Sequence, residues 1–376
     1  MSQNQSQLIQ LARDYQRASR AEKSAILERM QADTGWSRDH CRRSLRKTAN
    51  PTATATPGRP AGSRKYSTSA AEALEQVWHL VGQPSGRRLQ AMMPKLLSRL
   101  DQHGELCEAL STAEVRTELL TMSSASIDRY LRAARERCTP TLSDTDACLQ
   151  QRLAEHETVG EAGRFRLCAA ANPVANGSCS HIISLGLHDK LTGWRMRVAT
   201  PSTSPRVLFP ALNRLVRANP VPLRSIDVHT GSELLNFSLI SWAHERNIAV
   251  SPSRFATSDT ENANQPVQCD CLPHEMAMYE RQAQLQTQLW EVLDQRHNYL
   301  LPITRAKYKV WTGSSEVRVF DSLLTPLQRL EASLDGPLSS ALRWHDECLN
   351  PAAISREAAR LQAELALTKA QHAPAA

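Results

Sequence analysis

Residues 222–236, which read PLRSIDVHTGSELLN, decide the fold expected for this chain. An apolar run that ends at Ile226 and Val228 predicts a short strand, Gly231 interrupts it, and a helical pattern opens at Leu234. A strand, a tight turn and a helix in this order place chemically active groups at the carboxyl end of the strand. Here that end carries His229.

The segments on either side of this unit predict a mixed sheet. Before this unit, apolar or alternating segments separated by Asn-Gly and Thr-Gly turns predict three consecutive antiparallel strands, which form the first part of the sheet. Apolar residues at helical spacing predict one helix before and one after the strand that ends at Val228. The resulting order, βββαβαβ, is that of an RNase H-like α/β fold. The predicted strands cover 164–171, 181–189, 194–200, 222–228 and 248–251, and the helices cover 208–215 and 235–246.

The excess positive charge of the chain is confined to its N-terminal third. The chain contains 45 Lys and Arg residues against 38 Asp and Glu residues, a formal net charge of +7. Residues 1–138 hold 22 of the basic residues and 14 of the acidic ones, so the remainder is close to neutral. Such a basic segment is the electrostatic footprint of a protein that binds a polyanion such as double-stranded DNA. A basic surface that is merely solvated is the alternative.

Residues 1–48 predict a helix-turn-helix module. A helical pattern is followed by a turn at Gly35, by Ser37 as a candidate N-cap, and by a short basic helix. The second helix of such a module enters the major groove, where arginine binds phosphates or guanine edges. An αα-hairpin with a charged outer face is the alternative. The candidate DNA-binding residues of this helix are Arg38, Arg42 and Arg43.

A linker over 49–66, rich in Pro, Thr and Ala, precedes a second helical block over 67–138. The basic half of the linker is similar to an extended arm that lies in a minor groove. In the second block, a serine cap opens a helix with arginines on its polar side, which predicts another DNA-binding helix. The candidate residues of the two segments are Arg59, Arg64, Lys65, Arg129 and Arg132.

The rest of the chain is divided by composition. No apolar run approaches the roughly 20 residues that a membrane helix needs, and no secretory signal opens the chain, which predicts a cytoplasmic protein without membrane contact. The nine cysteines lack the spacing of a disulfide framework. The tail is expected to be solvated, with self-association or a partner as the alternative. The predicted segments are a linker over 139–160, the RNase H-like core over 161–270, a C-terminal subdomain over 271–335 and a helical tail over 336–376.

Several motifs, in a fixed order, resemble bacterial insertion-sequence transposases of the retroviral-integrase-like superfamily. The resemblance covers about residues 11–333, and no single motif carries it. In that family the strand of the opening stretch ends in an Asp that precedes a small residue and Gly-Ser-Glu. Here Gly-Ser-Glu is present and the acid is not. The motifs are Ala21 to Lys47, His103-Gly104-Glu105-Leu106, Ser124 to Arg137, Leu185 to Trp194 with Asp189, and Ile226 to Asn236.

The resemblance implies three catalytic acids that hold two divalent ions about 3.5–4 Å apart. In this chain their positions fall on Cys168, His229 and Gln265, and none of these is a carboxylate. A thiol, an imidazole and an amide offer Mg²⁺ a single neutral oxygen, although Mg²⁺ prefers oxygen ligands. Asp227 and Glu261 are the acids near enough in the sequence to replace the missing metal ligands. A working two-metal site would need at least two such replacements together.

These observations predict a DNA-binding protein of the transposase lineage that has lost metal-dependent catalysis and needs no cofactor. Two alternatives remain open from the sequence. One is an active transposase with displaced metal ligands, and the other is a regulator that binds a related transposase or a second copy of itself. A half zinc site at Cys269, Cys271 and His274 lacks a matching second pair, so no metal site is predicted.

Overall fold

The computed structural model divides the chain into two compact units. Unit 1 comprises Met1–Tyr66 with Ala306–Phe320, and unit 2 comprises Ser67–Arg305 with Asp321–Ala376. The structure describes residues 11–34, 38, 41–42, 44–45, 65–138, 162–173, 181–202, 204–229, 232, 234–253, 273–312, 315–334 and 336–370.

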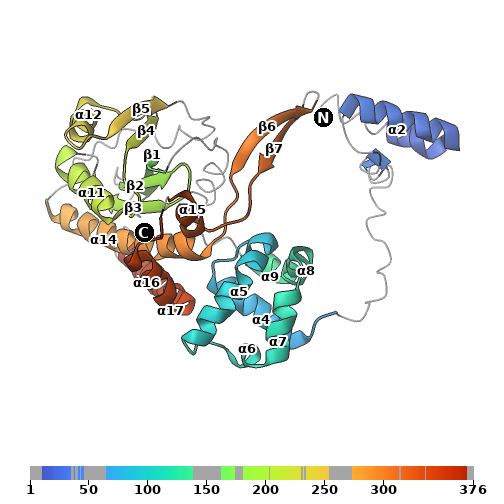
Figure 1. Ribbon diagram of the computed structural model, residues 1–376, viewed down its shortest axis with the longest axis horizontal. Coiled ribbons are helices and arrows are strands. Elements are labelled where there is room, and N and C mark those ends of the chain that lie inside the picture. The colour runs from blue at the N-terminus through green and yellow to red at the C-terminus, as the bar shows by residue number, and fades with distance from the viewer. Residues whose placement is uncertain are drawn as a thin grey trace. The chain divides into compact units, whose positions relative to one another are not determined.

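Unit 2 contains a five-stranded mixed sheet with the order β3-β2-β1-β4-β5 (Figure 1). β1 pairs antiparallel with β2, and β2 pairs antiparallel with β3. β4 runs parallel to both β1 and β5. This topology confirms the expected α/β class with an RNase H-like core. The strands are β1 Arg164–Pro173, β2 His181–Asp189, β3 Arg195–Thr200, β4 Ser225–His229 and β5 Ala249–Ser253.

One face of this sheet is apolar. Phe165, Leu187, Ile226 and Val228 alternate with polar neighbours and are fully buried. Helix α11 (Pro205–Ala218) packs against β3, and α12 (Phe237–His244) packs against β5. We place α11 and α12 on the apolar face because all their buried side chains are apolar. These are Leu208, Leu212 and Leu215 of α11 and Leu239, Trp242 and Ala243 of α12.

Helix α14 (Pro273–Gln295) packs on β2 and β3 and continues into η1 (Arg296–Leu300). Its apolar residues form one cluster with Ile182 and Ala199 of the sheet and with the C-terminal helix α17 (Pro351–Ala370). Leu361 of α17 is completely buried. The expectation of a solvated tail is therefore wrong, because the Ala- and Leu-rich face of α17 is covered by α14. Helices α15 (Pro326–Ser333) and α16 (Ser340–Cys348) lie between them in the chain.

Residues 67–138 form a helical module around Trp78. The Trp78 side chain is buried, and its Nε1 donates a hydrogen bond to the carbonyl oxygen of Pro84 at 2.9 Å. Buried leucines and methionines at helical spacing complete the core. The helices are α4 Thr68–Leu80, α5 Gly86–Gln102, α6 Glu108–Ser111, α7 Ala113–Thr121, α8 Ser124–Tyr130 and α9 Arg132–Arg137.

Unit 1 contains helix α2 (Arg20–Thr34), preceded by helical residues 11–17, and the antiparallel hairpin of β6 (Ala306–Thr312) and β7 (Ser315–Phe320). Ser19 and Glu22 cap α2 reciprocally. The predicted turn at 35–37 lies outside the described residues. Within the described residues, every helix is too short or too polar to cross a bilayer. The helical core contains Ala12, Tyr15, Leu27, Met30, Cys41 and Leu45.

Candidate functional site

The second face of the sheet is polar where β1, β2, β3 and β4 lie side by side. Arg166 of β1 is level with His188 of β2 and with Asp227 of β4. His188 is in turn level with Arg195 of β3. Because side chains on a strand alternate between faces, residues two positions along the strands point to this same face. Charged and titratable side chains therefore form rows across the sheet.

The next row contains two of the three positions that the resemblance implies. Leu167 pairs with Val228 in the parallel register of β1 and β4, so the residues that follow them, Cys168 and His229, are neighbours. Both lie two residues beyond the Arg166–Asp227 pair and share its face. His229 is also level with Ser253 of β5. Gln265 and Glu261 lie outside the described residues.

The environment of Cys168 keeps its thiol protonated near neutral pH. Desolvation raises the pKa of Cys168 to about 11, and the charge of Arg166 only partly opposes this shift. Desolvation also lowers the pKa of Arg166, against the opposing influence of Cys168 and Asp227. A thiol is nucleophilic as its thiolate, so this cysteine is not activated for attack.

Asp227, which the sequence offers as a substitute metal ligand, is occupied by two cations. Its side chain is only 1% exposed. Arg164 Nε donates to Oδ1 at 3.1 Å and to Oδ2 at 3.3 Å, and Lys190 Nζ donates to Oδ2 at 2.8 Å. Both oxygens of this buried carboxylate are committed to ion pairs, one of them with an Arg164 side chain that is 41% exposed. The structure therefore argues against Asp227 as a displaced ligand.

Asp189, another acid at this end of the sheet, has a structural role. Its Oδ1 accepts a hydrogen bond from the Gly163 amide at 2.8 Å. Its Oδ2 accepts from both the amide and the hydroxyl of Thr192 at 2.7 Å. Gly193 follows with a φ of +78°, a conformation that favours glycine. This carboxylate closes the β2–β3 turn and has no free oxygen for a metal.

The donors present on this face do not fit a pair of Mg²⁺ ions. The thiol of Cys168 and the imidazole of His229 are soft or borderline ligands, whereas Mg²⁺ takes carboxylate and water oxygens. The Arg166 guanidinium adds positive charge to the place where two dications would be needed. Among the described residues, no cluster of three or more His, Cys, Asp or Glu side chains has a geometry that could hold a metal ion.

A buried ion network under α14 was missed by the sequence analysis. Asp294 Oδ1 accepts hydrogen bonds from Arg195 Nε at 2.7 Å and from Arg197 Nε at 2.9 Å. The Arg197 guanidinium lies 3.7 Å from the centre of the Trp290 ring. The spacing of two between the arginines showed that they share a face of a strand. Their partner lies 99 and 97 residues further along the chain.

Two buried histidines beside this network have lowered pKa values, mainly because burial disfavours their charged form. Desolvation lowers the pKa of His188 well below its usual value, and the charges of Arg195 and Arg197 lower it further. Desolvation also lowers the pKa of His297, and Arg195 adds to that effect. The positive charge of this region therefore comes from the arginines. The two histidines are poorly suited to accept a proton near pH 7.

Helices α8 and α9 present the arginines predicted for the helical module. Ser123 caps α8, and its hydroxyl accepts a hydrogen bond from the Ser126 amide, as the sequence predicts. Arg129 and Arg132 are exposed and have no ion-pair partner among the described residues. Arg135, in contrast, is held by Asp128 at 2.6 Å. A shallow hollow is lined by Ala125, Asp128, Arg129, Arg132, Arg135 and Glu136.

The predicted basic residues of unit 1 are only partly described. Arg38 donates to Glu28 at 3.3 Å and to the Ser24 hydroxyl at 2.5 Å, which attaches its side chain to α2. Lys65 is exposed, with Nζ 5.2 Å from the centre of the Tyr66 ring. Arg42 belongs to the helical residues 41–42 and is partly buried. Arg43, Arg59 and Arg64 lie outside the described residues, so their role stays a prediction.

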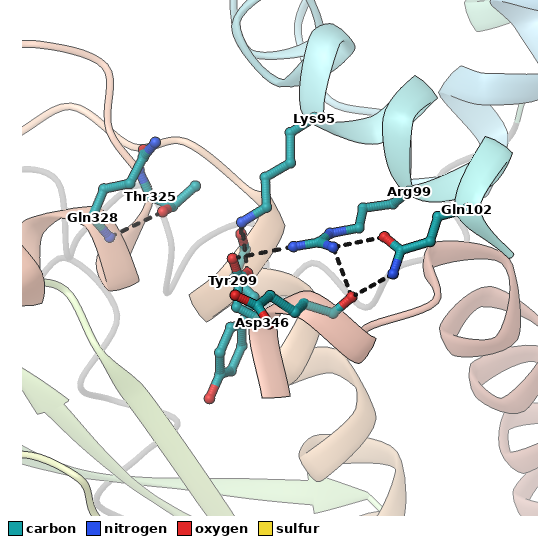
Figure 2. Close-up of polar contacts among 8 residues, drawn as sticks. Lys95, Arg99, Gln102, Tyr299, Thr325, Gln328 and Asp346 are labelled. Carbon is teal, nitrogen blue, oxygen red and sulfur yellow. Dashed lines mark hydrogen bonds and ion pairs between the residues drawn. The ribbon is translucent and has the colours of Figure 1, made fainter. Parts of the chain in front are cut away.

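Helix α5 attaches the helical module to the C-terminal helices (Figure 2). Lys95 Nζ donates to Asp346 Oδ1 at 2.6 Å and to the Tyr299 carbonyl oxygen at 3.1 Å. Arg99 donates to the Glu347 carbonyl oxygen at 2.6 Å. Side chains of α5 thus satisfy carbonyl groups at the ends of η1 and α16, where a helix leaves acceptors without internal partners. These contacts fix α5 against the C-terminal part of unit 2.

The His103-Gly104-Glu105-Leu106 motif completes this attachment. Gly104 has a φ of +65° and turns the chain at the end of α5. Glu105 accepts hydrogen bonds from Arg356 at 2.6 and 2.8 Å and from Asn350 at 3.1 Å. The hydrogen bond from Arg356, followed by that from Asn350, lowers the pKa of Glu105 to about 2. A motif with no evident role in the sequence therefore attaches the module to α17.

Comparison with known proteins gives distant matches. No family model matches the sequence. The chain is 29% identical over 251 residues to the uncharacterized protein y4rM of Sinorhizobium fredii, which covers 64% of this chain and 69% of that protein. It is also similar to a chain in the cryo-electron microscopy structure of the simian T-cell lymphotropic virus intasome in complex with PP2A regulatory subunit B56 gamma. That match has a TM-score of 0.31 and 9% identity, and covers 68% of this chain and 76% of that chain. A likeness this distant carries no argument about function, which rests on the side chains.

Proposed function

We propose that this chain is a DNA-binding protein of the integrase and transposase lineage whose RNase H-like core does not catalyse metal-dependent phosphoryl transfer. The observation that carries this proposal is the pair of neighbours Cys168 and His229 on the polar face of the sheet. They occupy the two positions where the resemblance implies metal-binding acids. Asp227, the carboxylate two residues before His229 on the same strand, is neutralised by Arg164 and Lys190. A two-metal mechanism needs carboxylates that bridge the ions at the reacting phosphate.

The loss of catalysis is tested with DNA ends and divalent ions. The unaltered protein is expected to show no Mg²⁺- or Mn²⁺-dependent cleavage or joining of labelled duplex ends, because its donors hold no pair of ions. A single change to an acid is expected to restore nothing. The triple change Cys168→Asp, His229→Asp and Gln265→Glu is the version for which metal binding, measured by calorimetry, is expected. Robust activity of the unaltered protein, abolished by Asp227→Asn or Glu261→Gln, would contradict the proposal.

DNA binding is tested on the full chain because the helical module packs on the C-terminal helices. The variant Arg129→Gln with Arg132→Gln is expected to bind duplex DNA about 30-fold more weakly at 0.15 M salt, with a salt slope smaller by about 1.8. Each arginine that neutralises a phosphate releases a counterion, and both effects follow from that release. Fluorescence anisotropy across a salt series measures them. The matched control, Arg343→Gln with Arg360→Gln, removes two charges from α16 and α17 and is expected to bind normally.

Full-strength binding by the Arg129 and Arg132 variant would show that α8 and α9 do not contact DNA. An affinity of the unaltered protein that does not change between low and physiological salt would count against a phosphate-binding role altogether.

A further inference from the structure

Helix α11 has an outer face of one charge sign, separate from the α8–α9 surface. Its sequence contains three arginines and no acidic residue. Arg206, Arg214 and Arg217 are all exposed. They are eight and three residues apart, so they lie on one side of the helix. At 1.5 Å rise per residue the row is about 16 Å long.

The charges on this row are only partly neutralised. Arg214 forms an ion pair with Glu291 of α14 at 2.5 Å. Arg206 and Arg217 have no ion-pair partner among the residues that the structure describes. The net charge of the row with its partner is therefore positive, and two of its three guanidinium groups are available to a ligand.

The exposed arginines Arg281 of α14 and Arg360 of α17 are arranged differently. On α17, Arg360 pairs with Glu357 at 2.7 Å and with Glu364 at 2.9 Å. Arg281 of α14 also reaches Glu364, at 2.6 Å. Such alternating charges are typical of a face that stays in solvent. The row on α11 lacks these glutamates, which separates it from an ordinary solvated helix face.

The row borders a hollow whose lining residue Asn213 is hydrogen-bonded to residues of α12 and the turn after it. The hollow is lined by Pro210, Asn213, Arg214, Arg217 and Ala218. The Asn213 side-chain oxygen accepts hydrogen bonds from Trp242 Nε1 and from Arg246 Nε, each at 3.1 Å. Arg246 also packs on the Trp242 ring, 5.0 Å from its centre. These contacts hold the edge of the hollow in place. Arg246 lies just beyond the end of α12 and also pairs with Glu245 at 3.2 Å, so it adds a hydrogen-bond donor to the surface without adding net charge.

We propose that the α11 surface, defined by Arg206, Arg214, Arg217 and Arg246, binds the phosphate backbone of duplex DNA. It would be a second contact of the RNase H-like core, in addition to α8 and α9. The proposal rests on the proposed DNA-binding function. A linear row of guanidinium groups about 16 Å long matches a line of phosphates. An acidic protein partner fits less well, because protein interfaces bury an apolar or aromatic centre and this row offers only Pro210 and Ala218.

The test compares variants of the full chain on long duplex DNA. Arg206→Gln with Arg217→Gln is expected to weaken binding about 30-fold at 0.15 M salt and to reduce the salt slope by about 1.8, because two phosphate contacts are lost. Arg343→Gln with Arg360→Gln is the matched control for charge. Both pairs are exposed, so circular dichroism melting is expected to be unchanged for each variant.

Three outcomes decide between the possibilities. If only the Arg129 and Arg132 variant loses affinity, the α11 surface is not a DNA contact and the proposed function stands. If the unaltered protein does not bind duplex DNA, the proposed function fails and this inference fails with it. Poly-glutamate that displaces bound DNA from the unaltered protein, together with undiminished DNA binding by the Arg206 and Arg217 variant, would identify an acidic polypeptide as the partner and overturn the proposal.

Discussion

Replacing Asp294 with alanine is expected to lower the free energy of unfolding of unit 2 by about 3–5 kcal/mol. Asp294 is 5% exposed, and its Oδ1 holds both Arg195 and Arg197. Without it, two guanidinium groups remain buried beside a desolvated histidine and lose the carboxylate that both contact. Removing one partner of a buried ion pair costs far more than the pair contributes, because the remaining charge is out of water.

Urea denaturation monitored by tryptophan fluorescence measures this effect. Glu291→Ala, which removes an acid of the same helix from an exposed pair with Arg214, serves as the control and is expected to cost less than about 1 kcal/mol. Replacing Asp294, Arg195 and Arg197 together with apolar residues of similar volume is expected to recover most of the loss. Equal denaturation midpoints for Asp294→Ala and the unaltered protein would contradict this prediction, because they would show that removing Asp294 leaves no costly buried charge.

Reversing the charge of Asp346 is expected to release α5 from the C-terminal helices. Asp346→Lys would place a third cation beside Lys95 and Arg99, which lie 2.6 and 3.5 Å from the carboxylate. The Lys95 hydrogen bond, worth about 1.5–3 kcal/mol as a charge-assisted bond, would be lost together with the longer ion pair from Arg99. Hydrogen exchange is expected to become faster in α5 and at the end of α16, because opening of this contact exposes their backbone amides.

The charge swap provides the control for this second experiment. Lys95→Asp combined with Asp346→Lys restores opposite charges across the same contact and is expected to return hydrogen exchange toward that of the unaltered protein. Lys95→Asp alone is expected to resemble Asp346→Lys. Identical exchange in all four proteins would mean that these ion pairs do not hold the helical module in place.

Local patterns in the sequence determined the elements of the core. The predicted strand 181–189 coincides with β2, and 248–251 lies within two residues of β5 at each end. Alternation of apolar side chains and glycine or asparagine turns are properties of neighbouring residues, so they can be read without the fold. The same patterns, with the resemblance they carry, led to Cys168 and His229. The sheet register confirms that these two residues lie on adjacent strands.

The state of each polar group was decided only by the tertiary structure. Asp227 is present in the motif, yet only the fold brings Arg164 and Lys190 to its two oxygens. Lys95 and Asp346 are 251 residues apart, and the amphipathic tail helix could equally have faced solvent until α14 covered it. Periodicity reports which side of an element is apolar, because that depends on residues a few positions apart. It does not report which distant side chain packs opposite that side. For a buried charged group, this partner determines whether the group is free to bind a ligand or is already neutralised by an ion pair.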